Sequence, residues 1–121
     1  SLTQGYYVGF CNETLWPLFH DMLDRCVFEK SHWADYRAVN RRFAEAILAA
    51  TRPGDILWIH DYHLLLVART LREMGAARRC LFFLHVPFPT PDLFRRLPWR
   101  REILEAMLEF RLLGFQTEYD A

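Results

Sequence analysis

The sequence is short of several features that would assign the protein to a specialised class. Its 121 residues contain three cysteines, an odd number without metal-ligand spacing, so we expect reduced thiols in a cytoplasmic protein. No basic and then apolar segment opens the chain, and no apolar run approaches the roughly 20 residues that span a bilayer. We therefore expect neither a signal segment nor a membrane span.

The chain also has a formal net charge of zero at pH 7. Fifteen basic and fifteen acidic side chains cancel, so nucleic acid and anionic membranes are not expected as main partners. Hydrophobic residues make up 52% of the chain and charged residues 25%, which is typical of one folded domain with a core. Because the chain lacks an initial methionine and stops soon after an apolar segment, we expect it to be a piece of a longer protein.

Three short apolar runs alternate with amphipathic segments, and this alternation predicts the fold. The apolar runs cover residues 56–59, 81–84 and 112–115, and the helical patterns cover 33–50, 64–74 and 102–110. The expected buried face of the helix at 33–50 comprises Trp33, Tyr36, Val39, Phe43, Ile47 and Ala50. Alternating strands and helices are typical of a parallel sheet with right-handed crossovers. The sequence therefore predicts one α/β domain whose sheet is flanked by helices and buried on both faces.

Polar residues follow two of the predicted strands. Asp61 comes directly after the first, and His85 ends the second ahead of a stiff Pro-Phe-Pro loop. Ligands of open α/β sheets bind beyond the carboxyl ends of the strands, so we expect one polar site there. Asp61 suits a carboxylate that binds sugar hydroxyls or acts as a base, and also a cap for the next helix. His85 suits either a substrate contact or a buried, hydrogen-bonded histidine.

Other polar and aromatic side chains leave alternatives open. The spacing of His60 and His63 could suit a metal, but one ends a strand, the other begins a helix, and no third ligand is obvious nearby; we predict no metal site. Tyr7 and Trp16 flank an irregular start, with Trp16 on a short helix that Asn12 is expected to cap. Both suit packing and contact with a sugar or phosphate equally. A solvated helical face is the better interpretation of the basic cluster formed by Arg95, Arg96, Arg100 and Arg101.

Short motifs recur across essentially the whole chain in the order and spacing of one enzyme family. They are YYVGFCN at 6–12, LWPLFH at 15–20, WADY at 33–36, HDYHL at 60–64, FLHVPFP at 83–89, LPWR at 97–100 and GFQT at 114–117. In these motifs the sequence resembles the trehalose-6-phosphate synthases. So many motifs in one order are far more specific than any single one.

The resemblance implies a fold and an activity. The expected fold is GT-B, with two Rossmann-like domains; this chain is the later part of the N-terminal, acceptor-binding domain, and the nucleotide-sugar-binding domain is absent from it. The expected reaction transfers glucose from UDP-glucose to glucose 6-phosphate with retention and forms α,α-trehalose 6-phosphate. Both sugars are substrates, so no cofactor is expected. A homo-oligomer of the full-length protein is compatible with the sequence.

The resemblance also assigns roles to residues. Tyr7 and Trp16 match positions that contact the phosphate end of the acceptor, Asp61 matches a carboxylate that binds acceptor hydroxyls, and His85 matches a histidine near the donor glucose and the reaction centre. The strand-end argument selected Asp61 and His85 independently. Three alternatives remain: a glucosylglycerol-phosphate synthase acting on glycerol 3-phosphate, a non-catalytic regulatory subunit, and a metal-dependent hydrolase built on His60, Asp61 and His63.

Overall fold

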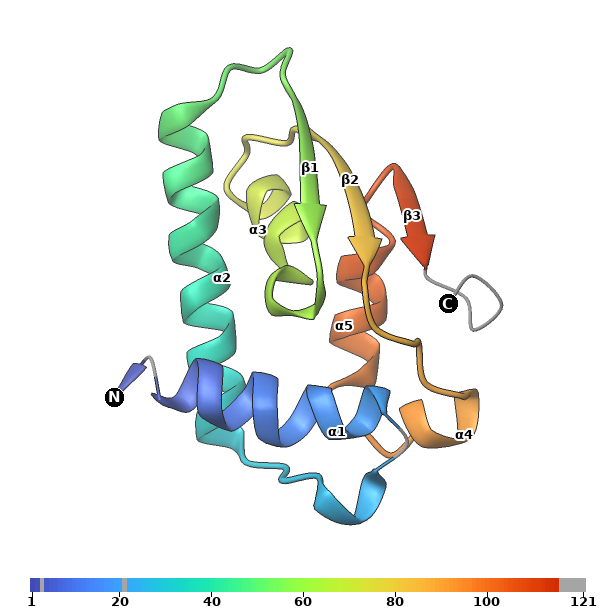
Figure 1. Cartoon of the computed structure of the whole chain (residues 1–121). Helices are drawn as coiled ribbons and strands as arrows, with labels where there is room; N and C mark the ends of the chain where they lie inside the picture. Colours follow the sequence, from blue (N-terminus) through green and yellow to red (C-terminus); the bar gives the residue numbers. More distant parts are fainter. Residues whose placement is uncertain (3, 21, 116–121) are drawn as a thin grey trace.

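The computed structural model describes residues 1–2, 4–20 and 22–115. The helical segments are η1 (Gln4–Leu15), α1 (Trp16–Phe19), η2 (Leu23–Arg25), α2 (Lys30–Ala50), η3 (Tyr62–Leu64), α3 (Val67–Glu73), α4 (Pro91–Phe94) and α5 (Arg100–Met107). The strands are β1 (Ile56–His60), β2 (Arg79–Leu84) and β3 (Leu112–Phe115). Figure 1 shows the long helix α2 beside the sheet and the N-terminal helical segment crossing below the strand ends.

The three strands form one parallel sheet in the order β1-β2-β3. Trp58 pairs with Leu81, which in turn pairs with Leu112. Helix α3 connects β1 to β2, and α4 and α5 lie between β2 and β3. The predicted parallel α/β fold is therefore confirmed, and β3 has the predicted bounds.

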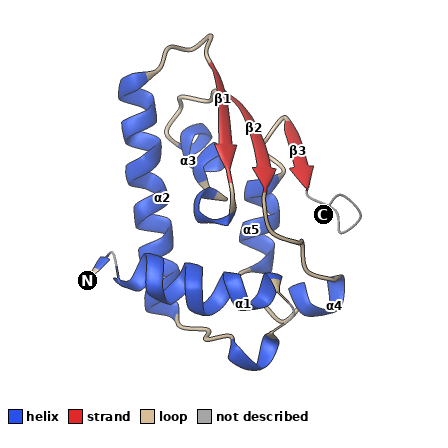
Figure 2. Ribbon diagram, in the orientation of Figure 1, coloured by secondary structure: helices blue, strands red, loops and turns tan. Residues whose placement is uncertain are grey.

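One face of the sheet is covered by helices in the part of the chain that the structure describes (Figure 2). Phe82 and Leu84 belong to the core that the strands share with α3 and α5, and they are 2% and 0% exposed. On the other face Ile56, Trp58 and Leu112 are 62%, 66% and 64% exposed. Successive strand residues point to opposite faces, so a strand meets solvent wherever one face lacks a cover. The expected burial on both faces is thus wrong for this chain.

The buried face of α2 also differs from the prediction. Its buried residues are Trp33, Tyr36, Asn40 and Ala44, whereas Phe43 is 44% exposed. A polar residue lies in the buried stripe because its amide bonds the backbone of the segment that follows β1. Apolar periodicity alone places Phe43 inward and misses Asn40.

The start of the chain, which was expected to be irregular, is helical from Gln4 onward. η1 is wound as a π-helix and continues directly into α1. A Cβ on Gly5 would lie 1.7 Å from Asp35 Oδ2, and a Cβ on Gly9 would lie 2.6 Å from His32 Cγ. Glycine at these two positions is therefore what allows η1 to lie directly against α2.

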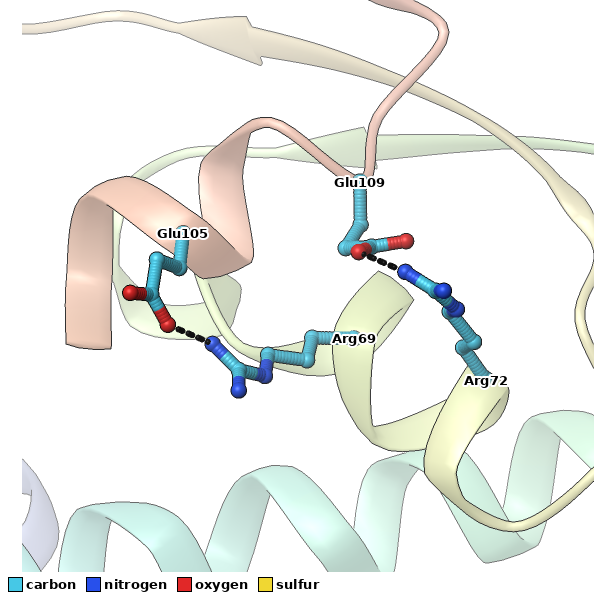
Figure 3. A network of polar contacts seen from close by, with 4 residues as sticks. All are labelled: Arg69, Arg72, Glu105 and Glu109. Atoms are coloured by element: carbon cyan, nitrogen blue, oxygen red, sulfur yellow. Dashed lines mark hydrogen bonds and ion pairs between the residues drawn. The ribbon is translucent and has the colours of Figure 1, made fainter.

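Two ion pairs on the exposed side of α3 join it to α5 and to the turn that follows α5 (Figure 3). Arg69 Nη1 lies 2.7 Å from Glu105 Oε2, and Arg72 Nη1 lies 2.5 Å from Glu109 Oε1. Because these side chains remain partly solvated, each pair stabilises the fold by roughly 0–1 kcal/mol. The apolar core beneath them contributes more to the packing of the two helices.

No helix within residues 1–2, 4–20 and 22–115 is long and apolar enough to cross a membrane. Cys11, Cys26 and Cys80 are thiols. Burial raises the pKa of Cys11 to about 12, so this thiol stays protonated at neutral pH.

Candidate active site

The carboxyl end of β1 meets the N-terminal helical segment through η3. The Tyr6 hydroxyl donates a hydrogen bond of 3.0 Å to the backbone carbonyl of His63. The Tyr7 ring stacks on the His63 ring, with centroids 5.8 Å apart, and Tyr7 is 50% exposed. Tyr7 therefore lies beside the segment that begins with Asp61, although its contact is with His63 and not with Asp61 itself.

Helix α1 lies against the segments that follow both β1 and β2. The Phe19 ring is 6.3 Å from that of Tyr62 and 5.9 Å from that of Phe88. Trp16, in the first turn of α1, is 39% exposed and stacks on His20. The structure thus places Trp16 on the helix that faces the strand ends, but it does not bring Trp16 into contact with the other predicted site residues.

Asp61 has a backbone conformation that few L residues adopt, with φ 70° and ψ 171°. Its N–H donates to the carbonyl of Phe83 at 2.8 Å, which extends the pairing of β1 with β2 beyond the strand. Its Oδ1 accepts from the N–H groups of Tyr62 at 3.0 Å and His85 at 3.4 Å. Such a conformation costs roughly 1–3 kcal/mol and is concentrated at functional sites.

The carboxylate of Asp61 caps η3 through one oxygen and leaves the other oxygen free to bind a ligand. Both of its hydrogen bonds fall on Oδ1, and Oδ2 has no partner among the residues that the structure describes. The predicted capping role is confirmed, with the bond made to the first N–H of η3. The binding of acceptor hydroxyls by Asp61 stays a prediction.

His85 is exposed, so the alternative of a buried histidine is wrong. Its ring nitrogen Nε2 lies 2.8 Å from Nδ1 of His60, the last residue of β1. The strand ends therefore bring His85 together with Asp61, through the backbone N–H, and with His60, through the ring.

The segment after Asp61 is held in place by α2. The Tyr36 hydroxyl donates to the Tyr62 carbonyl at 2.7 Å and accepts from Leu65 N–H at 3.1 Å. Asn40 donates to the His63 carbonyl at 3.2 Å and accepts from the N–H of Leu66 at 3.1 Å. These two buried side chains replace the partners that a short, non-α segment cannot supply for itself.

The sequence interpretation missed Tyr36 and Asn40 as supports of the site. One signal was available for Asn40, which is a polar residue one turn from Tyr36 on a helix face that is otherwise apolar. Its bonding partners lie more than twenty residues away in sequence, and only the tertiary structure identifies them.

Burial shifts the ionisation of several groups near the strand ends. It raises the pKa of Tyr62 to about 12 and that of Tyr36 well above its ordinary value, so both hydroxyls stay protonated at neutral pH. Burial also lowers the pKa of His63, against the opposing effect of the nearby Asp61 carboxylate. His63 is therefore a neutral ring stacked between Tyr7 and Tyr62.

The other basic and imidazole groups do not converge. His60 pairs with His85 while His63 packs on tyrosine rings. Within the described residues, no group of three or more His, Cys, Asp and Glu side chains is arranged to hold a metal ion. The arginine cluster lies on the surface, where Arg95 pairs with Asp92 at 3.6 Å.

The structure is an α/β domain with a parallel sheet. A carboxylate and two paired histidines lie at its neighbouring strand ends, and exposed aromatic rings of η1 and α1 lie nearby. This is the region in which open α/β sheets bind ligands. The sequence model of glycosyltransferase family 20 matches residues 1–121. The chain belongs to this family.

Similar proteins support the same family assignment. The bifunctional trehalose-6-phosphate synthase/phosphatase of Thermoproteus tenax is 51% identical over 121 residues, an alignment that covers 98% of this chain and 16% of that protein. The trehalose-6-phosphate synthase of Salmonella typhimurium strain LT2 is 48% identical over 117 residues, which cover 97% of this chain and 25% of the relative. The chain thus spans about a sixth and about a quarter of these two relatives.

A solved structure gives the same result for the fold. The alpha,alpha-trehalose-phosphate synthase (UDP-forming) of Burkholderia xenovorans, in complex with glucose-6-phosphate, superposes with a TM-score of 0.92 at 41% identity. The match covers 98% of this chain and 26% of that one. The resemblance to trehalose-6-phosphate synthases and the α/β fold that it implied are both confirmed.

Proposed function

We propose that this chain is the later part of the acceptor-binding domain of a retaining glucosyltransferase. The full-length enzyme transfers glucose from UDP-glucose to glucose 6-phosphate and forms α,α-trehalose 6-phosphate. One observation carries the proposal: Asp61 and His85 meet at neighbouring strand ends within a chain that matches trehalose-phosphate synthases over 98% of its length. One of those structures holds glucose-6-phosphate.

The acceptor lies against the strand ends and the N-terminal helical segment. Asp61 accepts hydrogen bonds from the acceptor hydroxyls through Oδ2, while Oδ1 keeps its backbone partners. Tyr7 and Trp16, both exposed, contact the phosphate end of the acceptor. A tyrosine hydroxyl and an indole N–H can each donate to a phosphate oxygen.

The chemical step proceeds on one face of the donor sugar. The anomeric hydroxyl oxygen of the acceptor forms a bond to C1 of the donor glucose while the bond from C1 to the UDP phosphate breaks. The hydroxyl proton passes to the leaving phosphate oxygen, so no protein nucleophile and no cofactor is required. Asp61 and His85 contribute by orientation and charge stabilisation.

The three thiols favour a cytoplasmic location.

The test is an assay of the full-length protein that contains this chain. UDP-glucose is incubated with glucose 6-phosphate or with glycerol 3-phosphate, and UDP release and the sugar product are measured. Transfer to glucose 6-phosphate supports the proposal. Transfer to glycerol 3-phosphate alone assigns the sister specificity, and binding of glucose 6-phosphate without turnover assigns a regulatory subunit.

A further inference from the structure

His60 and His85 meet edge to edge at the ends of β1 and β2. His60 Nδ1 lies 2.8 Å from His85 Nε2, and the ring centroids are 5.1 Å apart with 20° between the ring planes. Because the nitrogens are so much closer than the centroids, the rings point their nitrogens at one another. This is the geometry of a hydrogen bond rather than of face-to-face stacking.

The position of His60 is set by the sheet. Its backbone pairs with Phe83, two residues before His85, which directly follows the end of β2, so the two imidazoles lie on the same side of the sheet. The Trp58 ring lies 4.9 Å from that of His60, and the Phe83 ring lies 4.7 Å from that of His85. An aromatic neighbour on its own strand therefore limits the movement of each histidine.

Only one proton can lie between the two facing nitrogens, because one of them must donate and the other accept. In the neutral pair each ring carries one proton, so the accepting ring carries its own on its other nitrogen. If His60 Nδ1–H donates, His85 carries its proton on Nδ1 and presents a donor there. If His85 Nε2–H donates instead, Nδ1 of His85 is a bare acceptor. The bond therefore couples the protonation of Nδ1, the other ring nitrogen of His85, to the protonation of His60.

We propose that His60 is a positioning residue for the transfer reaction: its bond to His85 holds that ring and fixes which of its nitrogens carries the proton. The proposal rests on the proposed function, in which His85 lies beside the donor glucose. His60 acts through His85 and touches neither sugar. The sheet, a rigid element, thereby supports a catalytic side chain whose own attachment is to a loop.

The test compares three substitutions of His60 in the full-length protein. An asparagine amide takes the place of Nδ1, a glutamine amide reaches the place of Nε2, and leucine has no polar atom. His60→Leu should lower kcat about three- to tenfold, with the acceptor KM unchanged. The kcat of His60→Asn should be several-fold higher than that of His60→Leu, whereas the kcat of His60→Gln should stay as low as that of His60→Leu. Ile56→Ala, on the same strand and face, is the matched control and should keep the wild-type kcat.

A second measurement does not depend on turnover. In the 121-residue chain labelled with ¹⁵N-histidine, His60→Leu should shift the ring nitrogen resonances of His85. Unmoved His85 resonances, a wild-type kcat in His60→Leu, or equal recovery by glutamine and asparagine would each overturn the proposal. If the wild-type full-length protein transfers no glucose, the proposed function and the role in transfer both fail, and the resonances still decide whether His60 sets the His85 ring.

Discussion

At the scale of single residues, the proposed function gives Asp61 two tasks, a backbone cap through Oδ1 and acceptor binding through Oδ2. Its Oδ1 closes the start of η3 and bonds the backbone of His85, and its φ of 70° is held by the bond from its N–H to Phe83. A residue that served only as a cap would not need this strained backbone, because asparagine, serine and threonine cap helices from ordinary conformations. On the proposed function, this strained conformation places the carboxylate where Oδ2 can reach the acceptor.

Replacing Asp61 by alanine and by glycine separates the two tasks. In the full-length protein both variants should lose about ten- to a hundredfold in kcat/KM, because each lacks the charged hydrogen-bond acceptor. In the 121-residue chain, Asp61→Gly should be more stable than Asp61→Ala by roughly 1–2 kcal/mol, because glycine adopts a positive φ without strain. Urea unfolding measures this difference. An alanine variant that is much less stable yet keeps its turnover would show that Asp61 is only a cap.

His63 should make the stability of the fold depend on pH. Burial lowers its pKa in the folded chain below the value of about 6.5 in the unfolded chain. The unfolded chain therefore binds the proton first as pH falls, and stability present above about pH 6.5 is lost below it. Urea unfolding should show a larger loss between pH 7.5 and pH 5.5 for the wild type than for His63→Gln. Equal losses in the two proteins would contradict the shift.

At the scale of elements, α2 supports the site without contributing a predicted site residue to it. Tyr36 and Asn40 reach from its buried face to the backbone of residues 62–66. This segment contains the short helix η3, which has few internal hydrogen bonds of its own. Its placement after β1 therefore depends on α2, and the Asp61 carboxylate depends on that placement.

Removing the Tyr36 hydroxyl should measure this dependence. Tyr36→Phe leaves the Tyr62 carbonyl and the Leu65 N–H without a partner in a buried place, at a cost of about 1–3 kcal/mol in the free energy of unfolding. Tyr62→Phe is the matched control, because the Tyr62 hydroxyl has no hydrogen bond within the described residues. Chemical denaturation of both variants gives the comparison. Equal costs would show that the Tyr36 hydroxyl is not a support of the segment.

At the scale of the whole molecule, the sheet has one face open in the described residues. Ile56, Trp58 and Leu112 lie on it, and the two histidines of the strand ends project from the same side. The chain spans 16% and 25% of two relatives that it matches. The residues that bind the donor nucleotide, on the proposed function, lie in the remainder of the full-length protein.

The 121-residue chain alone should show no measurable glucose transfer. With no second domain to bind and enclose UDP-glucose, the donor is neither oriented nor shielded from water. The measurement is UDP release from UDP-glucose in the presence of glucose 6-phosphate, with the full-length protein as the positive control. Turnover by the isolated chain above the blank would contradict the proposed division of the site.

The sequence by itself determined the three strands and the family. Short apolar runs ending in polar residues located the strands and selected Asp61 and His85, because side chains at the carboxyl ends of parallel strands meet at one edge. The motifs identified the resemblance that the family match bears out. Both signals are local, so they can be found without knowing which segments pack together.

Only the tertiary structure decided how these elements support the site. The buried role of Asn40, the open sheet face with Trp58, the helical N-terminal segment and the bond between His60 and His85 all depend on contacts between segments distant in sequence. Periodicity indicates which side of an element is apolar, but not whether another element covers it or which backbone group a polar side chain reaches. Those outcomes are fixed when the chain packs, because burial and hydrogen bonding are properties of the packed neighbours.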